Sequence, residues 1–502
     1  MMPEGRSCLE GVNRSVFGCE PDYDSCMSEK RLSFQAPLAA AFNHAMEHLA
    51  PESNLPVAAT ASLETLRTRL GVRLGEAGVD ATVVIDDLVR AVEGGIIDSA
   101  GPRFFGWVIG GSLPAALAAD WLTSAWDQNA GMYACSPAAA VVEEVAGGWL
   151  KDVLGLPATA SFALVTGCQM AHVTCLLAAR HALLAKRQWD VEREGLAGSP
   201  AIRILTSTEI HGTTVRAVRM VGLGEKHIQG LAVDAERRLR EDVLIAALES
   251  APTEPTIVVL QAGDLNMGAF DDFARLIPIA KRFGAWVHVD GAFGLWCGAS
   301  ARFRHLLKGV ESADSWATDG HKWLNVPYDC GYAFVADREA HHGALSARAS
   351  YLTHADDARD QIDWNPEWSR RGRGFATYAA LRQLGRQGVA ELIERSCDLA
   401  HALVMRIGSL EGAEVVWEPQ INQGMVRFLD PRKGASEMDH DAFTDRMMAE
   451  VLASGEAFFT GTTWHGRRAM RVSVCNWQTT VEDVERVVMS VAKILRAARG
   501  KD

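Results

Sequence analysis

The stretch AWVHVDGAFG, residues 285–294, decides the class of fold. It is a short apolar run that ends in Asp290 and is followed by small residues, which predicts a buried strand and a turn. Similar runs recur as AIRILT (201–206), TIVVLQA (256–262) and GYAFVAD (331–337). An amphipathic helical pattern, FDDFARLIPIAKRFG, separates two of them. Strands that alternate with helices predict a mainly parallel sheet covered by helices, an α/β fold.

Four segments of different character make up the chain. Residues 1–30 are polar and aperiodic, which predicts a disordered leader. Residues 31–110 carry a helical spacing of apolar side chains and predict an N-terminal helical arm, and residues 111–380 predict a large α/β domain. Residues 381–502 contain a helical pattern, the strand-like runs AEVVW, GMVRFL and MRVSVC, and a closing helix after Thr480. This last segment predicts a small α+β domain.

The composition is that of an ordinary soluble globular protein, with 48% apolar and 23% charged residues among 502. The formal net charge of −13 argues against a nucleic-acid partner. No apolar run is long enough to span a bilayer, and the first residues lack the apolar stretch of a signal peptide. We therefore expect a cytoplasmic protein with no membrane partner.

The ten cysteines form no CxxC pair. Most of them lie in apolar segments, which favours buried, reduced thiols over disulfides or zinc ligands. Only Cys8, Cys19 and Cys26 cluster, in the polar leader, where free thiols are favoured over a metal site. The sequence therefore predicts no metal centre.

Asp290 stands where a parallel sheet places its ligands, at the carboxyl end of a strand. An ionised carboxylate at this point keeps a pyridine nitrogen protonated, and the protonated ring then accepts electrons from a bound substrate. The small residues Gly291 and Ala292 leave room for a flat ring. The alternative is an aspartate that only caps a turn.

Lys322 follows in SWATDGHKWLNVPYD, residues 315–329. Its neighbours Trp316, Trp323 and Leu324 are apolar, an unusual setting for a solvated charge. A lysine beside apolar surfaces loses its proton more readily and attacks an aldehyde. A surface lysine is the alternative, but the pairing with Asp290 favours a site for pyridoxal 5′-phosphate (PLP), which has both an aldehyde and a pyridine ring.

Two further segments fit this cofactor. In TGCQMAHVT (166–174) a glycine turn opens a helical pattern, and the N–H groups of Cys168 and Gln169 at a helix N-terminus suit a phosphate. In STEIHGTTVRAV, His211 follows a strand, and an imidazole there stacks on a flat cofactor and reaches a substrate carboxylate. Each signal is weak alone, because glycine turns are common and a lone histidine is more often structural.

Together these segments resemble the group II PLP-dependent amino acid decarboxylases, which include aromatic amino acid, glutamate and tyrosine decarboxylases. HVDGAFG resembles the family's HVDAA segment, DGHKWLNVPYDC its HKW segment, and TGCQMAHVT its phosphate turn. GPRFFGWVIGGS and ACSPAAAVVEEVAGGWL resemble its substrate-side segments. The resemblance covers roughly residues 35–495. It implies the type I PLP fold (aspartate aminotransferase-like) and a homodimer with active sites at the subunit interface.

The resemblance also implies roles for single residues. Lys322 is the Schiff-base lysine, Asp290 the pyridine partner, Ala292 a ring contact and His211 the stacking histidine. The remaining cofactor-binding candidates lie just before the lysine or at the phosphate turn: Asp319, His321, Cys168 and Gln169. At Cys168 and Gln169 the family usually has small or hydroxylated residues, so we expect backbone contacts to the phosphate there rather than side-chain contacts.

Other implied roles concern the reaction. ARASYLTHADD (347–357) resembles the family's mobile catalytic loop, and its Tyr351 falls where a tyrosine protonates the carbanion after CO2 leaves. With Lys322 and His211, Tyr351 completes the catalytic candidates; a packed loop aromatic is its alternative. The substrate-binding candidates are Phe105, Trp107 and Arg471, the last with a strand salt bridge as its alternative. In WSRRGRG, either Arg370 or Arg371 is a candidate ligand for phosphate or substrate.

We therefore predict that the protein decarboxylates an L-amino acid to its amine and CO2. The apolar segment around Phe105 and Trp107 favours an aromatic or bulky apolar side chain. Leu265, near the place where many members have a threonine under the cofactor, indicates a branch with varied substrates. The alternatives are a PLP-dependent aminotransferase, an aldehyde-forming oxidative decarboxylase, a C–C lyase, or a regulatory or assembly protein with this fold.

Overall fold

The computed structural model describes residues 33–50, 56–346 and 358–500. They divide into two compact units, one of residues 33–50 and 60–96 and one of residues 56–59 and 97–500. The predicted leader and Tyr351 lie outside the described residues. Residues 97–110, predicted to belong to the arm, are part of the second unit. There the backbone N–H of Phe105 donates to the carbonyl of Phe458.

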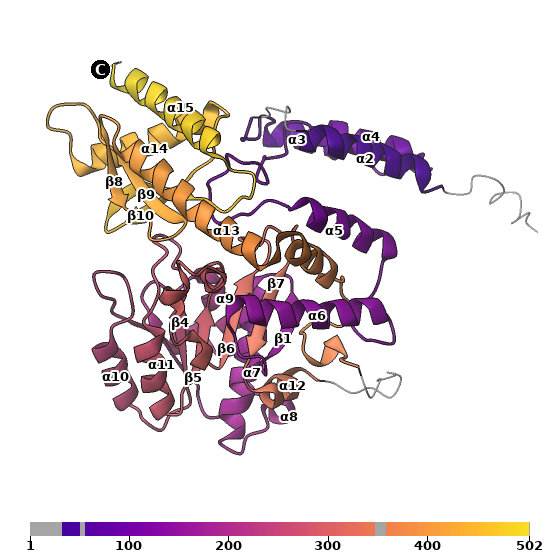
Figure 1. The fold of residues 1–502 in the computed structure, drawn as a ribbon, viewed down its shortest axis with the longest axis vertical. Coiled ribbons are helices and arrows are strands. Elements are labelled where there is room, and N and C mark those ends of the chain that lie inside the picture. Colours follow the sequence, from indigo (N-terminus) through magenta and orange to yellow (C-terminus); the bar gives the residue numbers. More distant parts are fainter. Residues whose placement is uncertain (1–32, 51–55, 347–357, 501–502) are drawn as a thin grey trace, which may run out of the picture. The chain divides into compact units, whose positions relative to one another are not determined.

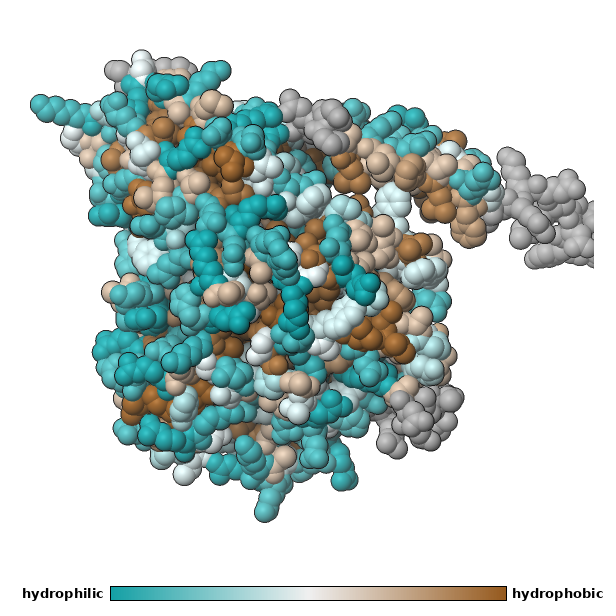
Figure 2. Space-filling view, in the orientation of Figure 1, coloured by the Kyte–Doolittle hydropathy of each residue, from teal (hydrophilic) through white to brown (hydrophobic). Residues whose placement is uncertain are grey.

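The first unit is helical, which confirms the predicted arm. It contains α2 (Gln35–Leu49), α3 (Leu63–Leu70) and α4 (Ala81–Val92). Ser62 and Asp80 cap the last two of these helices by accepting backbone N–H groups. Apolar side chains remain exposed along the helices (Figure 2), among them Leu38, Phe42, Met46, Val83 and Leu88. An apolar stripe of this kind is normally covered by another surface.

The second unit is built on a seven-stranded sheet in the order β1-β7-β6-β5-β4-β2-β3 (Figure 1). Its strands are β1 (Ser161–Val165), β2 (Arg203–Ser207), β3 (Ile228–Leu231), β4 (Thr256–Gln261), β5 (Trp286–Asp290), β6 (Ser315–Asp319) and β7 (Gly331–Val335). Strand β7 runs antiparallel to both of its neighbours, and the other pairs are parallel. The predicted mainly parallel α/β sheet is thus confirmed.

Helices cover both faces of this sheet, which explains why its strands are apolar throughout. Successive residues of β4 point to opposite faces, so Val258 and Leu260 enter one core cluster while Ile257 and Val259 enter another. The surrounding helices are α5 (Pro114–Trp126), α6 (Pro137–Leu154), α7 (Cys168–Ala185), α8 (Val191–Glu194), α9 (Gly212–Met220), α10 (Glu241–Glu249), α11 (Phe273–Arg282) and α12 (Arg338–Leu345). Helix α7 packs across β1, β5, β6 and β7.

The C-terminal part contains the small α+β structure that the sequence predicts. An antiparallel sheet in the order β10-β11-β9-β8 comprises β8 (Ala413–Trp417), β9 (Gln423–Phe428), β10 (Thr460–Trp464) and β11 (Arg467–Ser473). Its helices are α13 (Gly374–Gly408), α14 (Glu437–Ala453) and α15 (Val481–Arg499). A capping box at Thr480 and Asp483 starts α15, and Gly385, with φ of 61°, breaks α13.

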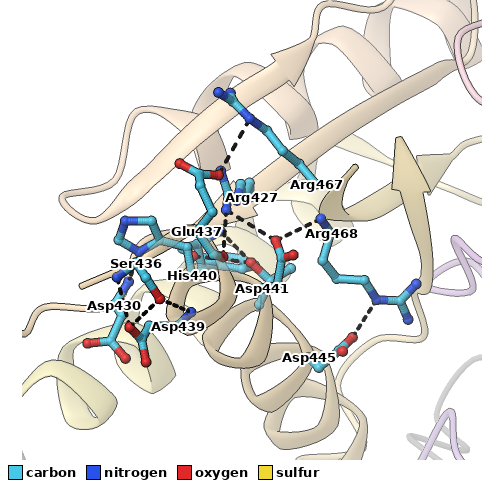
Figure 3. Close-up of polar contacts among 12 residues, drawn as sticks. Arg427, Asp430, Ser436, Glu437, Asp439, His440, Asp441, Asp445, Arg467 and Arg468 are labelled. Atoms are coloured by element: carbon cyan, nitrogen blue, oxygen red, sulfur yellow. Dashed lines mark hydrogen bonds and ion pairs between the residues drawn. The ribbon is translucent and has the colours of Figure 1, made fainter. Parts of the chain in front are cut away.

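A dense charge network stabilises this small sheet (Figure 3). Arg427 on β9 is only 1% exposed, and its guanidinium pairs with Glu437 at 2.8 Å and Asp441 at 3.1 Å. Arg468 donates its backbone N–H to Asp441 and pairs with Asp445 at 2.7 Å. A buried arginine with several acids around it has its charge compensated within the fold.

Among the described residues, we find no helix with the length and apolar character needed to cross a membrane.

Candidate active site

A cavity of about 310 Å³ opens at the carboxyl ends of the central strands. Loops that follow β2, β4, β5 and β6 contribute to it, together with the segment before α5. Parallel sheets gather ligands at this edge. The cavity is lined by Trp107, Val108, Ile109, His211, Gln261, Gly263, Leu265, Asp290, Ala292, Phe293, Lys322 and Tyr328. Four of the predicted cofactor residues, Lys322, Asp290, Ala292 and His211, therefore meet in one hollow.

Asp290 ends β5 and is buried at the floor of the cavity. Its Oδ2 accepts the hydroxyl of Thr214 at 3.1 Å and lies 3.5 Å from Nε2 of His172, and its Oδ1 accepts the N–H of Ala292 at 3.2 Å. Burial alone would raise the pKa of Asp290, but His172, His211 and Lys322 outweigh it and hold this pKa well below its usual range. The carboxylate is therefore ionised, as a partner of a protonated ring nitrogen must be.

Lys322 lies just after β6, beside Asp319. Its Nζ is 3.0 Å from Oδ2 of Asp319, while Oδ1 of Asp319 lies 3.3 Å from Nε2 of His321. The N–H of Cys330 donates to Nδ1 of His321, so Nε2 carries the proton that faces Asp319. Burial alone would lower the pKa of Lys322, but Asp319 outweighs burial and raises it. Asp319 therefore contacts both Lys322 and His321 and holds their side chains in place.

The N-terminus of α7 lies against the same aspartate. The N–H of Cys168, the first residue of the helix, donates to Oδ1 of Asp319 at 2.5 Å, and the N-cap residue Gly167 has no side chain that could accept the N–H groups that follow. A Cβ at Gly331 would lie 2.5 Å from Cα of Gly167, so the close approach of β7 to this turn requires glycine. Helix geometry leaves the first N–H groups without partners inside the helix, which suits a phosphate.

The side chains of Cys168 and Gln169 contact other protein groups, which argues against a role for them in binding the phosphate. The thiol of Cys168 is buried 3.4 Å from Nε2 of His172, and the amide of Gln169 lies 3.5 Å from the sulfur of Met220. Because Asp319 already accepts the N–H of Cys168, a backbone contact to an anion at this turn falls to the N–H groups that follow, such as that of Gln169, and this contact stays a prediction.

His211 is the N-cap of α9 and lines the cavity. Its Nδ1 accepts the N–H of Thr213 at 3.3 Å, which leaves Nε2 as the protonated nitrogen of the neutral ring. Burial is the main cause that lowers the pKa of His211, and the charge of Asp290 only partly opposes it. A neutral imidazole is the form that stacks on a flat ring.

The two predicted substrate-side aromatic residues lie in different environments. Trp107 lines the cavity and is 50% exposed, whereas Phe105 is buried against Phe459 at a ring-centroid distance of 5.4 Å. Phe105 belongs to the core of the small α+β part, so packing explains its apolar character. Tyr328 adds an aromatic wall that the sequence did not suggest, stacked on His321 at 4.2 Å.

The candidate arginines already have partners in the fold, and none of them lines the cavity. Arg370 forms a two-pronged pair with the buried carboxylate of Glu143, and Arg371 pairs with Asp120 at 2.7 Å. Arg471 on β11 donates to the carbonyl of Leu265 and to Oε1 of Gln423. Leu265 stands at the cavity wall, so Arg471 lies directly behind that wall.

Two histidines next to Asp290 were missed from the sequence. His172 is one helical turn after Cys168, and His288 precedes Asp290 by two residues, on the same side of the strand. This spacing was visible in the sequence, but each histidine sits in an apolar run where a packing role is the usual explanation.

The fold and the cavity together define a class. A lysine and a buried carboxylate meet at the carboxyl edge of a mainly parallel sheet, beside the N-terminus of α7, as in PLP enzymes of the type I fold. A family model described as the pyridoxal-dependent decarboxylase conserved domain matches residues 65–429. The chain thus belongs to the pyridoxal-dependent decarboxylase family and is a PLP-dependent amino acid decarboxylase.

Known relatives are similar to this chain over most of its length. It is 25% identical to an aromatic-L-amino-acid decarboxylase of Bacillus atrophaeus, over 89% of this chain and 92% of that protein. It is 29% identical to tryptophan decarboxylase 1 of Oryza sativa, over 78% and 80% of the two chains. The crystal structure of Oryza sativa TDC with PLP and tryptamine superposes with a TM-score of 0.85 at 24% identity, covering 92% and 97% of the chains. At this identity the superposition shows the fold alone.

The residues present fit PLP. Asp290 offers a buried anion for the ring nitrogen, Lys322 an amine for the aldehyde, and the first turn of α7 backbone N–H groups after Cys168 for the phosphate. Ala292 and His211 stand at the cavity, where small and flat surfaces accommodate a planar ring.

Proposed function

We propose that the protein converts an L-amino acid with an aromatic or bulky apolar side chain to the corresponding amine and CO2. The observation that supports this most is the make-up of the cavity, which combines Lys322 and Asp290 with an apolar wall. That wall comprises Trp107, Val108, Ile109, Leu265 and Phe293. Apolar pockets with few polar groups select ligands by shape and apolar surface.

Charge also favours this class of substrate. Among the described lining residues, Lys322 is the single lysine or arginine, and Asp290 the single acid. Both are committed to the cofactor in this proposal. An acidic or basic substrate side chain would therefore enter the apolar wall without a partner, which carries a desolvation cost. Arg471 stays a candidate for an anionic group only if Leu265 moves aside.

Each residue then has a defined task. PLP supplies an electron sink for the bond that breaks. Asp290 keeps the ring nitrogen protonated, and His211 covers the ring and orients the substrate carboxylate. Asp319 holds the amine of Lys322 in place when it is released during the exchange. Tyr351, a prediction that lies outside the described residues, donates the proton that replaces CO2.

We also propose that the protein is a cytoplasmic homodimer. The exposed apolar side chains of α2 and α4 supply surface that a second copy would cover. The cysteines among the described residues are all free, and six of these seven are buried, as in proteins of a reducing compartment. Light scattering on the purified protein tests the dimer, and a monomer at micromolar concentration contradicts it.

A panel of amino acids tests the substrate and the reaction. We expect equal amounts of CO2 and amine, with kcat/KM for tryptophan, tyrosine or phenylalanine at least tenfold above that for glutamate. A keto acid would instead indicate an aminotransferase, and ammonia with peroxide an aldehyde-forming enzyme. Cleavage of a C–C bond other than that to the carboxylate would indicate a lyase. Turnover of glutamate or 2,4-diaminobutyrate at the highest rate would contradict the apolar-substrate proposal.

A further inference from the structure

A line of buried side chains runs behind Asp290, on the side away from the cavity. Nε2 of His172 lies 3.5 Å from Oδ2 of Asp290, and Nδ1 of His172 lies 2.8 Å from Nε2 of His288. Nδ1 of His288 in turn lies 2.9 Å from Oγ of Ser315, which also accepts the indole N–H of Trp286 at 2.9 Å. His172, His288 and Ser315 are all 0% exposed.

The fold brings these residues together from three elements. His172 projects from the first turns of α7, and His288 from β5, two residues before Asp290. Ser315 begins β6, where it pairs in register with His288. None of the three lines the cavity, so they touch neither the cofactor nor the substrate directly. Two buried imidazoles in contact carry a desolvation cost that ordinary packing does not require.

The direction of the hydrogen bonds follows from the charge of Asp290. A carboxylate only accepts, so Nε2 of His172 carries a proton toward it. The pKa of His288 is lowered to about 3 by its burial, then by the charge of His172, so this ring is neutral and carries one proton. In the tautomer that carries this proton on Nε2, His288 donates to Nδ1 of His172, and Ser315 donates its hydroxyl to Nδ1 of His288. Every donor in the line then points toward Asp290.

We propose that His172 is a positioning residue that acts through Asp290. Its N–H fixes Oδ2 of Asp290 and keeps the carboxylate ionised, while His288 and Ser315 fix the tautomer of His172. This rests on the proposed role of Asp290 as partner of the ring nitrogen. Without His172, the donors to Asp290 that remain among the described residues are the hydroxyl of Thr214 and the N–H of Ala292. A buried carboxylate with fewer donors retains a proton more readily, and the ring nitrogen then loses it.

The test uses full-length protein reconstituted with PLP labelled with ¹⁵N at the ring. His172→Leu removes the donor, and His172→Gln keeps an N–H at a similar reach. We expect the ring-nitrogen resonance of His172→Leu to move toward that of an unprotonated pyridine, with PLP bound at least tenfold more weakly. In the same variant kcat falls at least tenfold, while KM stays within twofold. His172→Gln restores the resonance and most of kcat.

His341→Leu is the matched control for the loss of a buried imidazole. His341 is also 0% exposed, and its nitrogens contact Oγ of Ser161 at 2.7 Å and the carbonyl of Trp364 at 2.9 Å, outside the cavity lining. We expect this variant to unfold more easily, with an unchanged ring-nitrogen resonance. Ser315→Ala, a mild change at the far end of the line, shifts the resonance in the direction of His172→Leu by a smaller amount.

The outcomes separate this inference from the proposed function. If Asp290→Asn leaves the ring-nitrogen resonance unchanged, Asp290 is not the partner of the ring and the proposed role fails first. If Asp290→Asn moves the resonance but His172→Leu does not, only the role of His172 is overturned. Should His172→Leu fail to fold, an unshifted resonance in Ser315→Ala overturns it as well.

Discussion

Two clusters of charged side chains lie in the second unit, one around Arg427 on the small sheet and one around Asp290 and Lys322 at the edge of the large sheet. In the first cluster the charges pair with one another. Glu437 and Asp441 share Arg427, and Figure 3 shows these contacts among the side chains of the network. In the second cluster Asp290 and Lys322 both line a cavity of about 310 Å³.

The difference teaches what marks a site in this molecule. The network around Arg427 has more ion pairs, yet its charges are compensated by the fold and none of its residues lines the cavity at the large sheet. Asp290 and Lys322 both line the cavity, and each has a partner that does not line it, His172 for Asp290 and Asp319 for Lys322. Charged side chains that have a protein partner and also line a cavity are suited to bind a ligand. Mutations at the cavity should therefore reduce activity, whereas mutations in the network around Arg427 should reduce stability.

Lys322→Ala should give the largest effect. Removal of the amine abolishes covalent attachment of PLP, so we expect activity to fall by about 10³-fold or more. The visible absorbance that borohydride removes from the wild type should be missing. Thermal unfolding of the apo protein checks that the variant is folded. Normal turnover by this variant would contradict the role of Lys322, whereas a wild type with neither turnover nor this absorbance would favour a regulatory or assembly protein.

Asp290→Asn should come next. An amide cannot hold a protonated pyridine, so kcat should fall by about 10²-fold or more, with a smaller change in KM. The variant retains a side chain of similar size, and far-UV circular dichroism should match the wild type. Turnover within a few-fold of the wild type would contradict the role of Asp290 as partner of the ring nitrogen.

Arg427→Met tests the structural cluster. The substitution removes the guanidinium shared by Glu437 and Asp441, but these acids are 62% and 29% exposed and Glu437 keeps Arg467 at 3.5 Å, so we expect a loss of stability on the order of 2 kcal/mol. We expect a lower urea midpoint, with kcat and the PLP spectrum unchanged under conditions where the variant is folded. A selective loss of activity in the folded variant would mean that the network around Arg427 also shapes the site.

Much of the large sheet was predictable from the sequence because several of its strands are short apolar runs that can each be recognised without the others. AIRILT, TIVVLQA, AWVHVD and GYAFVAD all form strands, and Asp290 and Lys322 follow from their place after strands β5 and β6. The direction of β7 was not predictable, since periodicity is the same in both directions. Strand β10, TGTTW, was missed because it is half-buried and carries polar residues instead of an apolar run.

The site was predictable only in part, for a physical reason. The side chains predicted to contact the cofactor lie at the ends of strands, where sequence patterns can be recognised, whereas the residues that support them are scattered along the chain. His172 and His288 meet where α7 packs on β5, a contact between elements that no spacing along the chain specifies. Phe105 and Trp107 are two residues apart, yet one is buried in the small α+β part and the other lines the cavity. Adjacent aromatics diverge when the backbone passes between two cores.

A smaller effect is expected from pH. Burial lowers the pKa of His288 and of His341 to about 3, against roughly 6.5 in an unfolded chain. Between these values only the unfolded chain takes up the proton, so stability is full above pH ~6.5 and falls by about 1.4 kcal/mol per unit and histidine as pH drops toward 3. Asp271, whose pKa burial raises to about 6, opposes this trend below pH ~6.

Urea unfolding of the apo protein at pH 7.5 and 5.5 measures this dependence. His341→Leu should reduce the loss of stability between the two pH values by about 1 kcal/mol, because one of the two histidines no longer titrates. The site histidine His288 would then account for much of the remainder. An unchanged pH dependence in His341→Leu would mean that this imidazole is protonated in the folded protein, against its buried contacts with Ser161 and Trp364.

Tyr328→Phe should give the smallest effect, and it distinguishes two tyrosines near the same chemistry. The ring of Tyr328 stacks on His321, and burial raises the pKa of its hydroxyl to about 12, which makes it a poor proton donor at neutral pH. We expect kcat within about twofold of the wild type. Tyr351→Phe, by contrast, should reduce amine formation far more than CO2 release. If Tyr328→Phe instead produces that loss of amine, the proton comes from the cavity wall and Tyr351 is not its donor.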